Sequence, residues 1–208
     1  LHQAVHSFPT RRSSDLSNAF AGTLYNAGDS SSASGDYTTA IGAWASASGN
    51  SSTAIGANSK VDGNNSLAIG SLSDAKGDSS LAHGAGSISV ENSTAVGALS
   101  HATGDNSVAL GASTQATHAE TIAIGSGTAA LNEGAIAIGS QSSATHVDSV
   151  AIGLGSTTNR AHSVSFGTEN VTRQLTGVKA GTEATDAVNV EQLTSSTKEV
   201  LKTANNYT

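Results

Sequence analysis

Serine, threonine, aspartate and histidine are the side chains of this sequence that could do chemistry. The 208 residues include seven histidines but no cysteine. A hydrolase triad or a metal-assisted site needs such side chains to converge at one place. Here each type returns at regular intervals along the chain, and no Gly-x-Ser-x-Gly, Walker or His-Glu-x-x-His motif occurs. We therefore predict a protein that is not an enzyme and that has no cofactor and no metal site.

A five-residue stretch sets the regular interval. At residues 66–70 it reads Ser-Leu-Ala-Ile-Gly, and variants of it end at Gly42, Gly56, Gly70, Gly84, Gly97, Gly111, Gly125, Gly139, Gly153 and Gly167. The step is fourteen residues, except for thirteen between Gly84 and Gly97. Fourteen residues are too few for a helical hairpin repeat but enough for two short strands and two tight turns. The period predicts an all-β solenoid whose coils stack about 4.8 Å apart.

The two strands of each repeat differ in pattern. The second alternates small and polar residues, as in Ser73-Asp74-Ala75-Lys76, which predicts one buried and one wet face. The first is apolar on both faces, as in Ile136-Ala137-Ile138, so a lone coil would leave one apolar face in water. Such a patch usually marks an association surface, which predicts a homo-oligomer. We place the structural core at the residue before each repeat glycine: Ile41, Ile55, Ile69, Val96, Leu110, Ile124, Ile138, Ile152 and Phe166.

Turn residues separate the strands. At the middle of the repeat, Gly49, Gly63, Gly77 and Gly104 predict a positive φ, and His118, Asn132, His146 and Arg160 follow at the same position. The thirteen-residue unit loses one residue near Ile88–Glu91, where we expect a tightened turn. Phe166 lies in the last unit and marks the start of an exit from the stack.

The histidines do not form a metal site in this arrangement. His118 and His146 lie two coils apart, about 10 Å along the stack, whereas each zinc ligand must come within about 2 Å of the metal. His83 replaces the usual Ile or Val before a repeat glycine. It is open to three interpretations: an anion site formed at the axis by three symmetry-related histidines, a hydrogen-bonded core histidine, or a histidine tolerated near the edge of a coil.

Three large apolar residues, Trp44, Leu72 and Leu99, stand two positions after a repeat glycine. The alternation of the second strand places them on the outer side of the coil. We consider them candidate ligand-facing residues, because exposed aromatic side chains are favoured binding anchors. The alternative is that they only pack on an adjacent coil or a neighbouring chain.

Composition limits the type of core, the partners and the membrane contacts that this chain can have. The chain is 37% hydrophobic but only 3% aromatic, so it can build a thin repeated core rather than a thick globular one. Between residues 28 and 160 there are ten acidic and three basic residues, a balance of −7, which disfavours nucleic-acid partners. No apolar run reaches about 18 residues, so we expect no membrane contact within this fragment. Residues 1–20 lie outside the pattern and are interpreted as a non-native or linker segment.

The repeat resembles the head of trimeric autotransporter adhesins of the YadA type, through the motif Ser-Val-Ala-Ile-Gly-x-x-Ser-x-Ala-x-Gly. The segment that follows is similar to their neck, through Arg-Gln-Leu-Thr-Gly-Val at residues 173–178 and Thr-Asp-Ala-Val-Asn-Val at 185–190. The resemblance implies a left-handed parallel β-roll trimer, with a head at 21–167 and a neck at 168–193 that crosses between neighbouring chains. The neck residues singled out are Arg173, Gln174, Asp186 and Asn189; we expect Asp186 to cap a helix beginning at Ala187, and Arg173 to pair with Glu183 or Asp186.

The end of the chain predicts a stalk independently of that resemblance. Val190, Leu193, Thr197, Val200, Ala204 and Tyr207 follow the 3-4 spacing of coiled-coil a and d positions, so residues 190–208 should open an α-helical coiled coil. The resemblance implies the exposed passenger region of a bacterial outer-membrane adhesin that attaches to a host extracellular-matrix protein, to a ligand on host cells or to other surfaces, and it does not say which. A purely structural spacer in a surface or phage fibre is the alternative.

Overall fold

A computed structural model describes residues 25–206, and the segment 1–20 interpreted above as a linker lies outside them. The described chain divides into two compact units between Thr172 and Arg173. The first is a stack of β-coils and the second contains one helix. Each unit is described by itself below.

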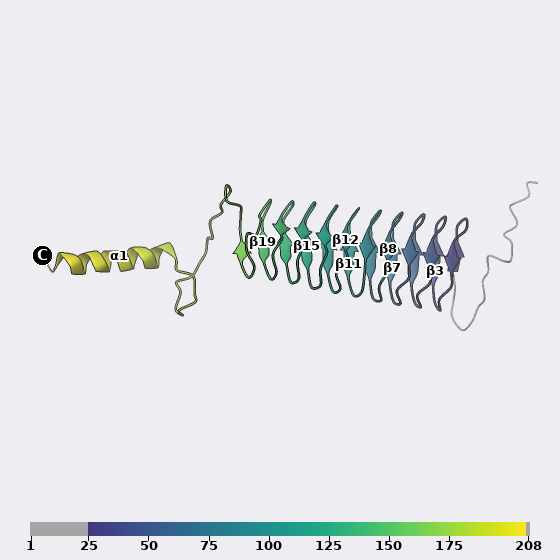
Figure 1. Ribbon diagram of the computed structural model, residues 1–208, viewed down its shortest axis with the longest axis horizontal. Helices are drawn as coiled ribbons and strands as arrows, with labels where there is room; N and C mark the ends of the chain where they lie inside the picture. The colour runs from purple at the N-terminus through teal and green to yellow at the C-terminus, as the bar shows by residue number, and fades with distance from the viewer. Residues whose placement is uncertain (1–24, 207–208) are drawn as a thin grey trace, which may run out of the picture. The chain divides into compact units, whose positions relative to one another are not determined.

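The first unit is a roll of two parallel sheets that face each other (Figure 1). One sheet has eleven described strands, namely β1 (Tyr25–Ala27), β3 (Thr39–Ile41), β5 (Thr53–Ile55), β7 (Leu67–Ile69), β9 (Leu81–His83), β11 (Thr94–Val96), β13 (Val108–Leu110), β15 (Ile122–Ile124), β17 (Ile136–Ile138), β19 (Val150–Ile152) and β20 (Val164–Ser165). The other has nine, namely β2 (Ser32–Ala33), β4 (Ser46–Ala47), β6 (Lys60–Val61), β8 (Asp74–Ala75), β10 (Ile88–Ser89), β12 (His101–Ala102), β14 (Gln115–Ala116), β16 (Ala129–Ala130) and β18 (Ser143–Ala144). Equivalent residues of successive repeats pair directly, as Ala54 does with Ala68 and Ala47 with Val61, so the predicted parallel β-solenoid is confirmed.

Small side chains fill the inside of the roll. From β3 to β19 the central residue of each three-residue strand is a fully buried alanine, as at Ala68 and Ala123. Small residues such as Ser73 and Ala75 fill inward positions on the side of the other sheet. The buried hydroxyls of Ser73 and Thr114 donate to the carbonyl oxygens of Gly70 and Gly111, at 2.8 and 2.9 Å. A buried hydroxyl needs such a partner. The same side chains therefore fill the core and close the turn after the repeat glycine.

The structure corrects the expected core. The residues before the repeat glycines, Ile41, Ile55, Ile69, Val96, Leu110, Ile124, Ile138, Ile152 and Phe166, are half-buried or exposed within the single chain. Ile138, for example, is 40% exposed, while its neighbour Ala137 is fully buried. Alanine takes the inner face of these strands, and the Val, Leu and Ile side chains take the outer one.

Glycine has two separate roles in the turns. The repeat glycines from Gly42 to Gly153 have positive φ, such as 129° at Gly42. The mid-repeat glycines do not, contrary to our expectation; at Gly63 a Cβ atom would instead stand 1.8 Å from the carbonyl oxygen of Gly77. At this turn the positive φ falls two residues later, on Ser51, Asn65, Ser79, Asn106, Glu120, Gly134, Asp148 and His162. Four non-glycine residues occupy the position of the mid-repeat glycines and likewise have no positive φ, namely His118, Asn132, His146 and Arg160.

The thirteen-residue unit contains the predicted tightened turn. Ile88 pairs both with Asp74 and with His101, so the lost residue lies after β10, between Ser89 and Thr94. There the Ser93 amide donates to the Val90 carbonyl oxygen at 3.1 Å, and the Ser93 hydroxyl accepts from the Val90 amide at 2.6 Å. The coil is shortened without disturbing either sheet.

The second unit contains helix α1 (Val190–Asn205). Asn189 caps it in a capping box: its Oδ1 accepts from the Gln192 amide at 3.0 Å, and Gln192 Oε1 accepts from the Asn189 amide at 3.4 Å. The prediction of an Asp186 cap and a start at Ala187 is therefore wrong. Asp186 Oδ2 instead accepts from the amides of Thr182 and Glu183, at 2.9 and 3.0 Å, and these hydrogen bonds lower the pKa of its carboxyl group.

No residue of α1 is buried within the single chain. The a and d side chains Val190, Leu193 and Val200 are 80%, 62% and 65% exposed. A helix with an apolar stripe and no internal partner is typical of one strand of a coiled coil. Tyr207, the last predicted position, lies outside the described residues. None of the helices within residues 25–206 is long and apolar enough to cross a membrane.

Candidate ligand-binding surface

The candidate ligand-facing residues Trp44, Leu72 and Leu99 each lie in the turn that follows a repeat glycine, and together they are called the stripe. The second residue after the glycine has a left-handed backbone, with φ of 61° at Trp44, 59° at Leu72 and 55° at Leu99. Their side chains are 63%, 63% and 57% exposed. The backbone therefore directs all three away from the coil interior, as the alternation of the second strand predicted.

Large apolar residues are unusual in this conformation. The left-handed region costs about 1–2 kcal/mol for an L-residue with a side chain. Other coils place tolerant residues at the same position, namely Asn58, Gly86, Gly127 and Gly155. A strained position that carries a large exposed side chain favours a functional hypothesis over a purely structural one.

One member of the stripe also touches its own roll. A Cβ atom added to Gly86 would stand 2.9 Å from Leu99 Cδ2, so Leu99 leans over the preceding coil. Gln141 leans over Gly127 in the same way, with its Cγ at 3.8 Å from the equivalent point. Leu99 thus combines partial packing with an exposed surface.

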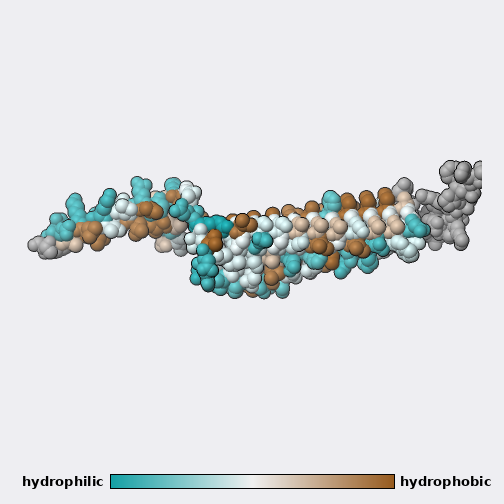
Figure 2. All heavy atoms as spheres, turned by 90° about the horizontal axis from the view of Figure 1, so that it is seen from above, coloured by the Kyte–Doolittle hydropathy of each residue, from teal (hydrophilic) through white to brown (hydrophobic). Residues whose placement is uncertain are grey.

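A second apolar surface lies on the outside of the eleven-stranded sheet. Both outward positions are aliphatic in β7, β13, β15, β17 and β19, as at Ile122 and Ile124 of β15. Ile124, Ile138 and Ile152 are 36%, 40% and 37% exposed. Figure 2 shows hydrophobic side chains following the roll in rows. We call this surface the aliphatic ladder; its residues lie on directly paired strands and so form a contiguous patch, unlike the single exposed apolar residues that are normal on a soluble protein.

His83 interrupts this ladder. It pairs with Ile69 on one side and Val96 on the other, and its side chain is exposed. The core-histidine interpretation therefore does not hold within the single chain. The anion site that three such histidines would form stays a prediction.

Of the other histidines within residues 25–206, His101 belongs to strand β12, and His118, His146 and His162 lie at turns. Thr117 Oγ1 lies 3.0 Å from His118 Nδ1, and Thr145 Oγ1 lies 3.1 Å from His146 Nδ1. His162 Nδ1 lies 3.4 Å from Asp148 Oδ2. Over residues 25–206 no group of three or more His, Cys, Asp or Glu side chains is placed to hold a metal ion.

The lysines of the roll face aspartates. Lys60 pairs with Asp62, and Lys76 Nζ lies 3.7 Å from Asp74 Oδ2, on the outer face of β6 and β8. The hydrogen bond to Asp62 raises the pKa of Lys60. Each of these lysines neutralises the charge of a neighbouring aspartate. The remaining excess of acidic side chains therefore lies mainly along the mid-repeat turns, at residues such as Asp78, Glu91 and Asp105.

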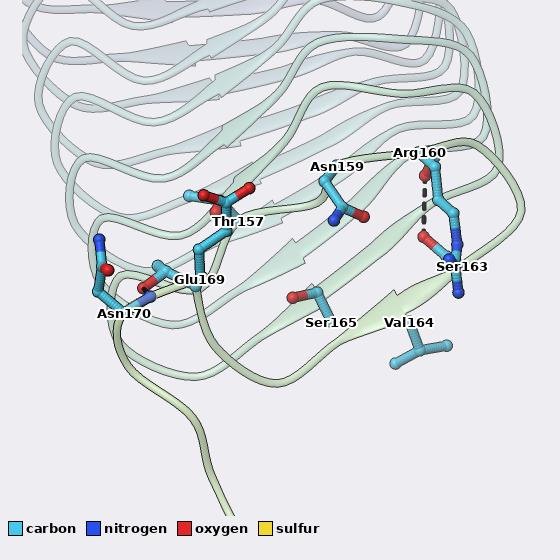
Figure 3. A pocket seen from close by; sticks show the side chains of 9 residues that line it. Thr157, Asn159, Arg160, Ser163, Val164, Ser165, Glu169 and Asn170 are labelled. Carbon is cyan, nitrogen blue, oxygen red and sulfur yellow. Dashed lines mark hydrogen bonds between the residues drawn. The ribbon is translucent and has the colours of Figure 1, made fainter.

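A cleft at the end of the roll was not predicted from the sequence. It has a volume of about 430 Å³ and is lined by Thr157, Asn159, Arg160, Ser163, Val164, Ser165, Thr168, Glu169 and Asn170. Figure 3 shows Arg160 and Val164 on one side of it and Glu169 and Asn170 on the other. It forms where the last coil ends at β20 and the turn from Thr168 to Val171 begins. In the sequence, the only sign of this cleft is that the repeat becomes irregular after Gly153.

In the second unit, the predicted neck residue Asn189 and its capping partner Gln192 bind the loop that precedes helix α1. Asn189 Nδ2 donates to the Val178 carbonyl oxygen at 3.2 Å, and Gln192 bonds both backbone groups of Gly181, at 2.8 and 2.9 Å. These contacts fasten the loop at 178–181 to the start of α1. The pairing of Arg173 and the role of Gln174 stay predictions.

Comparison with known proteins gives two family matches. The YadA head domain repeat matches residues 28–43, 33–59, 47–73, 62–87, 91–114, 102–128, 130–156 and 144–170. The coiled stalk of trimeric autotransporter adhesin matches residues 174–208. A search of curated proteins gave no significant match.

Among solved structures, the chain is similar to the crystal structure of the collagen-binding domain of the Yersinia adhesin YadA. The two are 38% identical, with a TM-score of 0.61, and the likeness covers 79% of this chain and 84% of that one. The head repeats match over more than half of the chain and the stalk match follows directly. The chain therefore belongs to the YadA-like trimeric autotransporter adhesins, a family of adhesins rather than of enzymes.

Proposed function

We propose that this chain is the head, neck and stalk start of an outer-membrane adhesin whose head binds collagen-type matrix proteins. The observation that carries the proposal is the likeness to a collagen-binding domain at 38% identity over most of the roll. The division remains head 21–167, neck 168–193 and stalk 190–208. Membrane anchoring belongs to the same proposal and follows from family membership.

The proposed assembly is a homotrimer in which the aliphatic ladder is covered by neighbouring copies. In this arrangement the neck residues Arg173, Gln174, Asp186 and Asn189 guide each chain from the roll into the coiled coil. Trp44, Leu72 and Leu99 then present an apolar stripe to the ligand. Three copies of the stripe strengthen weak contacts through multivalency.

The test is a binding array of the purified trimer against collagens, fibronectin, laminin and epithelial cells. We expect saturable binding to at least one collagen. The triple variant Trp44→Ser, Leu72→Ser, Leu99→Ser should keep the trimer and its melting temperature but weaken binding. Ser113 occupies the same turn position naturally, so serine is compatible with the backbone there.

Binding to none of these partners would favour the alternative, a structural spacer. A triple variant that loses thermal stability but binds as well per folded trimer would assign the stripe to packing.

A further inference from the structure

His83 is the polar exception in one row of the aliphatic ladder. The row consists of the last residues of strands β3 to β19, and its other members are Ile41, Ile55, Ile69, Val96, Leu110, Ile124, Ile138 and Ile152. Ile69 and Val96 pair with His83 on either side of it. Among residues 25–206 no group forms a hydrogen bond with its imidazole. One group that needs a polar partner thus stands in a row that otherwise needs none.

The second outward row of the ladder, formed by the first residues of the same strands, is less apolar. It includes Thr39, Thr53 and Thr94. In β15 the last residue, Ile124, is exposed in the single chain while the first, Ile122, is half-buried, and β17 and β19 have the same pattern. The last-residue row therefore has more apolar surface to lose on assembly, which places it nearest the three-fold axis of the trimer.

Three-fold symmetry brings the copies of His83 to one level. A closed three-fold axis places the three copies of any residue at the same height and at the same distance from the axis. Three isoleucine methyl groups in contact at about 3.5–4.0 Å lie about 2.0–2.3 Å from that axis. Histidine Nε2 stands about one bond length further from its Cβ atom than an isoleucine methyl group does. Three imidazoles can therefore reach the distance of about 2.0–2.1 Å at which nitrogen binds zinc.

Val96 supplies a second, independent observation. It is the only valine among the last residues of β3 to β19, and it lies directly beside His83. Valine is one methyl group shorter than isoleucine, so three copies of Val96 leave room on the axis for a molecule the size of water. Ile69, on the other side of His83, has the full length of the row. A zinc ion with three protein ligands takes a water molecule as its fourth.

We propose that three copies of His83 bind one divalent transition-metal ion on the axis of the head, with a water ligand beside Val96. Imidazole nitrogen suits zinc, copper and nickel. The inference rests on the proposed trimer and not on its matrix ligand, because each chain supplies a single histidine. Such a site departs from the expectation of no metal, which considered histidines along one chain. No group within residues 25–206 of a single chain is placed to hold a metal ion, so the site exists only in the assembly.

The ion would connect the three chains in the middle of the head. Without a ligand, three imidazoles among isoleucine side chains would leave buried nitrogens without partners, which is costly. A bound ion satisfies these nitrogens. Because the ion binds the assembled state alone, it stabilises the trimer against dissociation.

The test compares three single variants of the trimeric full chain. His83→Ile restores the residue type of the row, so the head should fold and lose the ion site. Val96→Ile keeps the histidines but fills the space for water, and should weaken zinc binding about tenfold to a hundredfold. His101→Gln is the matched control, because it removes a histidine from β12, in the other sheet.

Isothermal titration of the chelator-treated proteins with zinc chloride measures the site. The unaltered chain and His101→Gln should each show one tight site per three chains, and His83→Ile should lack it. Zinc should raise the melting temperature of the first two proteins, and EDTA should reverse the rise. Zinc binding and stabilisation that are the same in His83→Ile as in the unaltered trimer would overturn the inference.

The remaining outcomes separate the ion site from the assembly on which it rests. A folded monomer in light scattering would refute the trimer and the site together. A trimer without a tight zinc site would refute the site alone. Stabilisation by chloride or sulfate instead of zinc, lost in His83→Ile, would overturn the metal and assign the three histidines to an anion.

Discussion

At Gly63 one added methyl group would block the stacking of the roll. The Cβ atom would stand 1.8 Å from the oxygen and 2.3 Å from the carbon of the Gly77 carbonyl group. Backbone cannot rotate away as the end of a side chain can. Glycine at position 63 is thus required by the close approach of the Gly77 backbone in the next coil, because Gly63 does not need a positive φ.

Gly63→Ala should therefore lower the free energy of unfolding by at least about 2 kcal/mol per chain, through overpacking. Gly155→Ala is the matched control. Gly155 has φ of 65° but no atom within 4 Å of an added Cβ, so the substitution should cost about 1 kcal/mol from backbone strain alone. Thermal unfolding followed by circular dichroism compares them, and a larger loss at Gly155 would contradict this explanation.

Asp78 links the stability of one turn to pH. Its Oδ1 accepts from the Asn64 backbone amide at 2.7 Å and from the Asn64 side-chain amide at 3.1 Å, and these hydrogen bonds lower the pKa of the Asp78 carboxyl group. A folded-state pKa below the unfolded one contributes stability at neutral pH that is lost as the pH falls through the folded value.

Asp78→Asn should therefore reduce the difference in melting temperature between pH 7 and pH 3. Asp105→Asn removes the same charge at the equivalent position two coils further on. If both variants shift the acid side of the curve equally, net charge rather than the Asn64 contact controls the effect.

At the scale of elements, the start of α1 shows how local competition sets a boundary. Asp186 and Asn189 are both good N-caps by residue type. Asp186 already accepts two backbone hydrogen bonds from the preceding turn, whereas Asn189 has Gln192 three residues ahead and completes a capping box. The helix consequently begins at Val190.

Asn189→Ala should destabilise the helix by about 1 kcal/mol and lower the helical signal in circular dichroism. Asp186→Ala should open the turn at Thr182 and Glu183 while leaving the helical signal unchanged. The reverse order of effects would restore Asp186 as the cap.

The repeat predicted the coils because each fourteen-residue step places equivalent residues side by side. The inner and outer faces of the second strand followed from its alternation of small and polar residues, as at Ser73 and Asp74. The first strand could not be assigned in that way, since Ala137 and Ile138 are both apolar. The buried interior of the roll consists mostly of alanine, serine and threonine, and Ala137 joins that interior while Ile138 faces outward.

The candidate stripe was predictable from the position of Trp44, Leu72 and Leu99 relative to the repeat glycines. Their left-handed backbone was not, because positive φ at large apolar residues contradicts local preference. The cleft beside Arg160 and Glu169 arises where repeats cease, so the periodic pattern carried no information about it.

At the scale of the whole molecule, the aliphatic ladder requires a partner. Ile138 is 40% exposed in the single chain, so a charge there would be hydrated in a monomer but buried in the proposed trimer. An unpaired buried charge is strongly destabilising. A charged substitution in the ladder should therefore disrupt the assembly of the trimer more than the folding of a single coil.

Ile138→Asp should lower the melting temperature of the trimer or dissociate it. Gln115→Asp, on the exposed outer face of β14, should be close to neutral. Size-exclusion chromatography with light scattering measures the mass of each variant, and thermal unfolding followed by circular dichroism measures its melting temperature. Equal behaviour of the two variants would mean that the ladder is not covered by neighbouring copies.

Sedimentation equilibrium of the 208-residue chain tests the proposed assembly most directly. The chain mass is 20.4 kDa, so a trimer has three times that mass, about 61 kDa. We expect the trimeric mass at micromolar concentration, together with a β-rich circular dichroism spectrum. A folded monomer of 20.4 kDa under the same conditions would contradict both the covered ladder and the trimeric presentation of the stripe.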